Sequence, residues 1–125
     1  MTTMLRYNTL PVPATADLSG AASRFKIINL AGTICAAGDV SAAGILHNTP
    51  KTNDTAEAIY NGLAKAISGG TVSTAGWPLK VANSGFVVAA ASGDSPIYGS
   101  FIDSCASGDL VRVYVDFFNN GYWRG

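Results

Sequence analysis

Apolar and polar residues alternate through positions 110–117, near the C-terminal end of the chain. Val111, Val113, Val115 and Phe117 fall on one face, and a period of two with one wholly apolar face is typical of a β-strand. The Ser-Gly-Asp sequence at 107–109 precedes this run, and such a sequence readily turns the chain into a strand. The pattern therefore predicts a turn followed by a half-buried strand.

The same turn chemistry recurs along the chain. Glycine-centred turns are expected at 37–39, 69–70, 75–77, 83–85 and 92–94. Short apolar segments lie between them, and we expect strands at 25–30, 33–35, 45–48, 78–82, 86–90 and 97–103. Segments this short leave no room for crossover helices, so the sheet should be largely antiparallel. The prediction is an all-β barrel or sandwich, with room for one short helix.

Residues 56–67 fit two secondary structures. Their Ala, Glu, Leu and Lys content favours a helix, which Asp54 or Thr55 would cap and Gly69 would end. Gly62 lies at the centre, where it would weaken a helix by about 1 kcal/mol relative to alanine. A pair of strands interrupted near Gly62 agrees better with the strands expected on both sides. We favour that interpretation and leave the helix as the alternative.

Residues 1–23 contain isolated apolar positions without a sustained helical or alternating pattern. Pro11 and Pro13 favour extended backbone in this segment. We interpret residues 1–23 as an extended N-terminal arm and residues 24–125 as the β domain. The arm would order on a neighbouring protein, and a frayed terminus is the alternative. Its apolar anchors would be Leu5, Tyr7, Leu10 and Val12.

The charge of the chain bears on its partners. Eight Lys plus Arg balance eight Asp plus Glu, so the formal net charge is zero and no basic field would attract nucleic acid. Charged residues make up 13% of the chain, against about a quarter in typical domains. A neutral surface with few charges favours association with other proteins. We therefore expect a protein partner and no nucleic acid.

The chain also shows no membrane-spanning pattern. Residues 1–13 lack a basic region followed by a continuous apolar run, and no apolar run approaches the length needed to cross a bilayer. We expect a protein that is made and used in the cytoplasm, or in a particle assembled there. Cys35 and Cys105 are interpreted as small buried apolar residues, and a disulfide between them is the alternative that spacing does not decide.

No pattern in the chain indicates catalysis. His47 is the only histidine, which excludes a two-histidine metal site, and no serine lies in a nucleophile elbow. We interpret His47 as a strand-end or surface residue and expect no enzyme activity, no cofactor and no metal. A carbohydrate-binding module is an alternative, because aromatic side chains stack on sugars. The aromatic residues considered for that role are Trp77, Tyr98, Phe101, Tyr122 and Trp123.

The ordered set of turns and strands resembles the small capsid decoration, or head cement, proteins of tailed phages. The resemblance covers about residues 30–117, and the G-I-L-x-N-x-P-like run at 44–50 is also similar. Trp77 departs from the family, which commonly has a polar residue there. The matching positions are Gly62-Leu63-Ala64, Thr74-Ala75-Gly76, Ser84-Gly85, Ile97-Tyr98-Gly99, and Ala106-Ser107-Gly108-Asp109 with Val111 and Val113.

The resemblance implies a non-enzymatic virion protein that binds the outer capsid surface and holds neighbouring capsomers together. Many such proteins are trimers, so it also implies a homotrimer whose partner is the major capsid protein, assembled in the host bacterial cytoplasm. A fibre-associated or carbohydrate-binding β module is the alternative function. The candidate partner-binding residues are Leu5, Tyr7, Leu10, Val12, Trp77, Tyr122 and Trp123.

Overall fold

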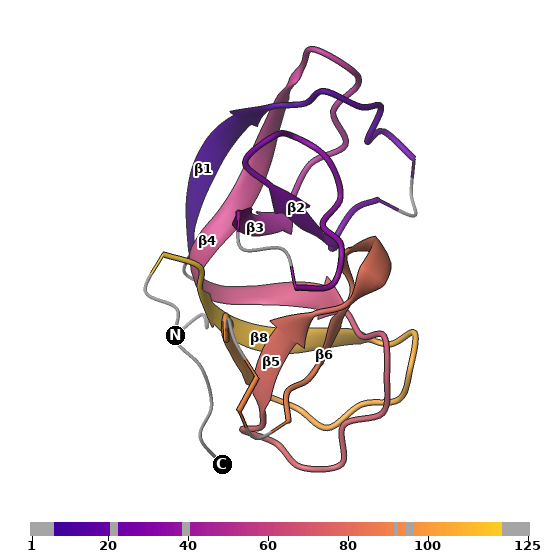
Figure 1. Cartoon of the computed structure of the whole chain (residues 1–125), viewed down its shortest axis with the longest axis vertical. Helices are drawn as coiled ribbons and strands as arrows, with labels where there is room; N and C mark the ends of the chain where they lie inside the picture. Colours follow the sequence, from indigo (N-terminus) through magenta and orange to yellow (C-terminus); the bar gives the residue numbers. More distant parts are fainter. Residues whose placement is uncertain (1–6, 21–22, 39–40, 92, 95–96, 119–125) are drawn as a thin grey trace, which may run out of the picture.

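The chain folds into an antiparallel sheet that curls almost into a barrel (Figure 1). The structure is a computed structural model and describes residues 7–20, 23–38, 41–91, 93–94 and 97–118. It confirms the expected all-β class. The strands are β1 (Tyr7–Pro13), β2 (Ile27–Asn29), β3 (Ala42–Leu46), β4 (Thr55–Ile67), β5 (Pro78–Val81), β6 (Val87–Ala89), β7 (Gly99–Phe101) and β8 (Leu110–Asp116), with a 3-10 turn at Asn83–Gly85.

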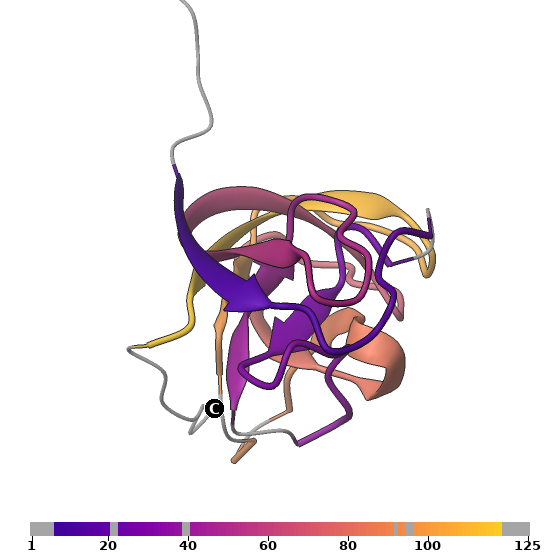
Figure 2. The same ribbon diagram turned by 90° about the horizontal axis from the view of Figure 1, so that it is seen from above.

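The strands follow the order β2-β3-β4-β8-β7-β5-β6, and β1 pairs with β4 beside this path. All pairings between these strands are antiparallel, as the short connections predicted. The last strand in the order, β6, returns to the end of β4, where the Gly69 N–H donates to the Val87 carbonyl (2.9 Å). This contact draws the far edge of the sheet back toward its middle, and Figure 2 shows the resulting ring of strands.

The long strand β4 organises the sheet. Its first half lies between β1 and β3, and its second half pairs with β8 from Asn61 to Ile67. Gly62 has a φ of 114°, a backbone conformation that favours glycine, and it lies where the partners of β4 change. The prediction of two strands interrupted near Gly62 is therefore wrong in one respect. Residues 56–67 are extended, but they belong to a single strand that continues through Gly62. The helical alternative is excluded.

Two clusters of buried side chains form the core. The larger cluster fills the barrel, and the smaller one lies between the sheet and the segment that follows β1. Ile27 and Ile45 belong to the barrel cluster, whereas Ile28 and Leu46, their neighbours in sequence, belong to the smaller one. Strands β2 and β3 are thus buried on both faces, which explains why their sequences lack the alternation seen in β8.

The described part of the predicted N-terminal arm lies against the sheet. Residues 7–13 are extended, as expected, and they pair with β4 along their whole length. Val12 is 3% exposed, and Ala14 and Leu18 after it are also buried. The Leu18 N–H donates to the Pro50 carbonyl (2.9 Å), which holds this segment over the smaller cluster. The boundary between arm and domain at residue 23 stays a prediction.

Most other expected strands are present with shorter bounds, whereas the strand expected at 45–48 begins and ends earlier, at Ala42–Leu46. The segment 33–35 is an exception, because it forms an isolated bridge from Ile34 to Ile28 instead of a strand. Cys35 is buried and Cys105 half-buried, and neither of these two described cysteines forms a disulfide bond. Both pack in or against the barrel cluster, as expected of small apolar residues. Within the described ranges, no helix has the length and apolar content needed to cross a membrane.

Candidate binding surfaces

The structure separates the residues that the sequence suggested for partner binding. Tyr7 is 38% exposed, Leu10 is half-buried, and Val12 is buried inside the chain. Val12 therefore has almost no side-chain surface left for a partner. Leu5, Tyr122 and Trp123 lie outside the described residues.

The described aromatic residues among those considered for sugar binding are buried or half-buried. Trp77 is half-buried, packs against the barrel cluster and donates from Nε1 to the Ala90 carbonyl (2.8 Å). Tyr98 is buried and stacks on Phe117, with ring centroids 4.7 Å apart. Phe101 is also buried. These residues stabilise the barrel and do not form an exposed platform for stacking on a sugar.

The outer face of β8 carries an apolar surface that the sequence reasoning missed. Leu110 and Tyr114 are 49% and 46% exposed, and they lie opposite Ile67 and Leu63 of β4. Ile102, just after β7, is also exposed. Leu110 and Tyr114 alternate with the buried valines of β8, so their apolar side chains on the outer face were the signal in the sequence that could have predicted this surface. We name this surface the β8 patch: Leu63, Ile67, Ile102, Leu110 and Tyr114.

Two cations lie between the apolar pairs of the β8 patch. Lys65 on β4 is directly opposite Arg112 on β8, and like charges in this position repel. Asp103 offsets the charge of Arg112 because it accepts two hydrogen bonds from the guanidinium, each 2.8 Å long. These bonds hold the pKa of Asp103 below its ordinary value and raise the pKa of Arg112. Lys65 has no such partner among the described carboxylates.

A cavity of about 460 Å³ lies beside β4 and adjoins the β8 patch at Lys65. Tyr7 and His47 form one wall, where the Tyr7 hydroxyl is 3.2 Å from His47 Nε2. Arg24 donates from Nε to the His47 carbonyl (2.9 Å), and its guanidinium lies 4.6 Å from the centroid of the Phe25 ring. We name this cavity the Tyr7 groove: Tyr7, Arg24, Phe25, His47, Ile59, Ala64 and Lys65.

His47 directly follows β3 and is half-buried, in agreement with its interpretation as a strand-end residue. Its ring stacks at a tilt on Tyr7, with centroids 5.2 Å apart. In the part of the chain that the structure describes, no cluster of three or more His, Cys, Asp or Glu side chains could hold a metal ion. The described contacts of His47 thus connect β3 to β1.

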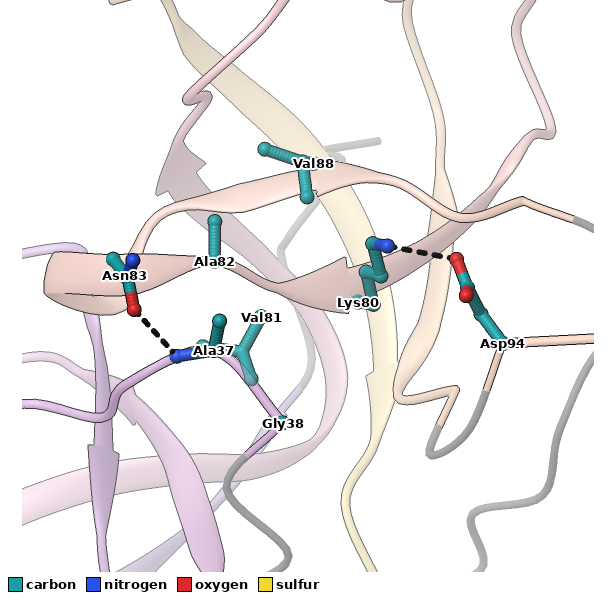
Figure 3. A pocket seen from close by; sticks show the side chains of 8 residues that line it. All are labelled: Ala37, Gly38, Lys80, Val81, Ala82, Asn83, Val88 and Asp94. Carbon is teal, nitrogen blue, oxygen red and sulfur yellow. Dashed lines mark hydrogen bonds and ion pairs between the residues drawn. The ribbon is translucent and has the colours of Figure 1, made fainter.

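A second cavity, of about 450 Å³, lies between the β5–β6 hairpin and the loop before β3 (Figure 3). Lys80 forms an ion pair with Asp94 across it (2.7 Å), and the hydrogen bond from Lys80 holds the pKa of Asp94 below its ordinary value. The Ala37 N–H donates to Asn83 Oδ1 (3.1 Å). The two charged groups that line this cavity, Lys80 and Asp94, pair with each other. The hydrogen bond between Ala37 and Asn83 holds the loop before β3 against the hairpin.

No protein-family model matches the chain, and no curated protein matches it. Among solved structures, the fold is similar to that of the N base of the head fiber protein gp8.5 of bacteriophage phi29, determined by crystallography. The two chains superpose with a TM-score of 0.65 and are 12% identical, and the match covers 90% of this chain and 96% of that chain. At this identity the similarity shows a shared fold.

Proposed function

We propose that this chain is a non-enzymatic structural protein of a phage head that binds the outer surface of the shell. The observation that carries the proposal is the shared fold with a head fiber base over 90% of the chain. The resemblance of the turn sequence to capsid decoration proteins points independently to the same part of the virion. The chain would join the particle during assembly in the host bacterial cytoplasm.

The exposed surface supports a role in protein association. Charged residues are scarce, and the β8 patch combines the exposed Ile102, Leu110 and Tyr114 with half-buried apolar residues of β4. Exposed apolar surfaces of this kind favour binding to other proteins. The finer role that we propose is that of a decoration protein, a homotrimer that contacts the major capsid protein and holds neighbouring capsomers together.

The base domain of a head fibre is the second candidate function. The similar solved structure favours it, because that structure is the N base of a head fiber protein. Both functions place the chain on the outer surface of the head, and they differ in the number of copies expected per particle. The carbohydrate-binding alternative is weaker, because Trp77 and Tyr98 are engaged in the barrel.

The copy number of the chain in purified particles tests the proposal. Quantitative mass spectrometry should give the ratio of this chain to the major shell protein. We expect a ratio near one, which corresponds to symmetric decoration of the shell. A few copies per particle would instead favour the fibre base, and complete absence from the particle would contradict both head functions.

Replacement of Tyr114 by serine tests whether the β8 patch takes part in attachment. We expect Tyr114→Ser to lower the affinity of the purified chain for heads that lack it by about tenfold, since a central aromatic residue often dominates an interface. Leu30→Ser is the matched control, because Leu30 is similarly exposed (52%) and lies outside the patch. Equal binding by both variants would show that the patch faces solvent in the particle.

A further inference from the structure

A third cavity lies beside the outer edge of β6, where the sheet almost closes into a barrel. Its volume is about 370 Å³, and residues 71–74, Trp77 and residues 89–91 line it. We name this space the β6 cavity. Its volume is within the range of ligand sites in proteins.

The β6 cavity marks the point where two segments of the chain separate. The Gly69 N–H donates to the Val87 carbonyl (2.9 Å), but no backbone hydrogen bond joins residues 70–74 to the rest of β6. The segment after Gly69 instead turns toward Cys105, with which Val72 exchanges two backbone hydrogen bonds (2.8 and 2.9 Å). The pairing that begins at Val87 therefore stops, and the cavity lies between the two segments.

The backbone of Ala89 faces the β6 cavity. Residues two apart in a strand direct their N–H and C=O groups to the same side, and Val87 accepts from Gly69 on the side away from β5. Ala89 shares that side with Val87, whereas Ala90 donates to Pro78 of β5 (2.9 Å). No described residue forms a hydrogen bond with the N–H or C=O of Ala89. These groups form an unpaired strand edge, to which an extended peptide can add.

The described residues of the loop after β6 do not cover this edge. The Asp94 N–H donates to the Ala91 carbonyl (3.0 Å), which closes a tight turn. The Asp94 carboxylate pairs with Lys80 over the face of the β5–β6 hairpin (Figure 3). Farther on, the Tyr98 N–H donates to the Leu79 carbonyl at the edge of β5 that faces away from β6 (3.1 Å). These residues therefore lie over the hairpin face and along the far edge of β5.

The two ends of the described chain lie beside the middle of β4. Tyr7 pairs with Gly62, and the Phe118 ring centroid lies 5.3 Å from that of Tyr60. The β6 cavity instead follows the C-terminal end of β4, which is Ile67. Both of its walls thus come from the interior of the sequence.

The lining of the β6 cavity is uncharged. None of the described residues that line it is acidic or basic. Residues 89–91 are all alanine, and Trp77 adds an apolar ring whose Nε1 is already bonded to a carbonyl of that segment. The exposed hydroxyl groups at the cavity come from Thr71, Ser73 and Thr74. This lining suits a neutral ligand with small side chains.

We propose that the β6 cavity binds an extended, uncharged segment of the head-shell protein. The segment would pair with the N–H and C=O of Ala89 as an added strand and place small side chains against Trp77. This inference rests on the proposed function and names the chemistry of its partner. A peptide backbone carries a donor and an acceptor at the spacing of the strand edge, whereas a sugar does not, so the edge favours a peptide.

Hydrogen–deuterium exchange of the chain, free and bound to heads, tests the contact directly. The Ala89 amide of the free chain should exchange rapidly, because no described group accepts its hydrogen. On heads we expect this amide to exchange at least about tenfold more slowly, as a bonded strand amide does. Unchanged exchange at Ala89 in the bound chain would overturn the proposal.

Head binding by a variant that fills the cavity gives a second measurement. Ser73→Tyr places a large side chain at the cavity and should weaken binding to heads by about tenfold, because the added ring excludes a strand. The variant should stay folded, since Ser73 is exposed. Thr52→Tyr is the matched control, at an exposed position outside the cavity, and should bind normally. Equal binding by the two variants would contradict the assignment.

The outcomes separate this inference from the proposed function. A chain present in particles at high copy number, with unchanged exchange at Ala89 and normal binding by Ser73→Tyr, would overturn the cavity assignment and leave the head function standing. Absence from particles would contradict the head function itself. Protection of the Ala89 amide in the free chain by dextran would overturn the peptide in favour of a sugar. Protection that rises with the concentration of the free chain alone would assign the edge to a second copy.

Discussion

Replacement of Gly99 by alanine is expected to lower the free energy of unfolding by about 3 kcal/mol or more, since it adds overpacking to an unfavourable backbone conformation. A Cβ atom at this position would lie 1.9 Å from the Tyr114 carbonyl oxygen and 2.9 Å from its carbonyl carbon. These are backbone atoms of β8, and Gly99 pairs with Val115 of the same strand. The clash is therefore relieved only if β7 separates from β8.

Urea denaturation of the purified variant measures this loss. Gly108→Ala is the matched control, because Gly108 also has a positive φ (90°) but no atom lies within 4 Å of its added Cβ. We expect the control to lose about 1 kcal/mol from backbone conformation alone. Similar losses in the two variants would show that β7 and β8 accommodate the methyl group and that the close approach is unimportant.

Replacement of Phe101 by alanine is expected to cost about 3–5 kcal/mol, the range for a large aromatic side chain removed from a core. Phe101 is fully buried in the barrel cluster and belongs to β7. Its N–H donates to the Trp77 carbonyl (2.9 Å) and its own carbonyl accepts from Gly76 (2.7 Å). Phe101→Ala keeps both backbone hydrogen bonds, so the lost free energy of unfolding measures the removal of the side chain and the cavity that it leaves.

The neighbouring residue provides the control for this second variant. Ile102 is 36% exposed and follows Phe101 directly, so Ile102→Ala should cost less than about 1 kcal/mol. Thermal unfolding of both variants in the same buffer would compare their stabilities. A Phe101→Ala variant as stable as Ile102→Ala would mean that the barrel collapses around the missing ring and that its core is less tightly packed than the structure indicates.

The two candidate binding surfaces meet at Lys65, and this arrangement bears on attachment. On one side of Lys65 lie the exposed apolar residues of the β8 patch, and on the other lies the Tyr7 groove.

Local sequence patterns were sufficient for much of the fold. The valines at 111, 113 and 115 point into the barrel as their alternation predicted, because a half-buried strand shows its buried face in its own sequence. The predicted turns also marked the ends of most strands, because turn residues such as glycine are recognised from the local sequence. Strands β2 and β3 were located, yet their burial on both faces was not foreseen, since neither is long enough to display a pattern.

Tertiary contacts decided β4 and the site. Ala56, Ala58, Ala64 and Ala66 favour a helix locally, but they are buried beneath closely packed neighbours, and pairing with β1, β3 and β8 overrides that preference. Tyr7 was predicted as a binding residue from its own segment. Its association with Arg24, His47 and Lys65 depends on pairing between strands far apart in sequence. Periodicity shows which face of a strand is buried. Which residues line the same cavity depends on the register between strands, and strands far apart in sequence meet only in the folded chain.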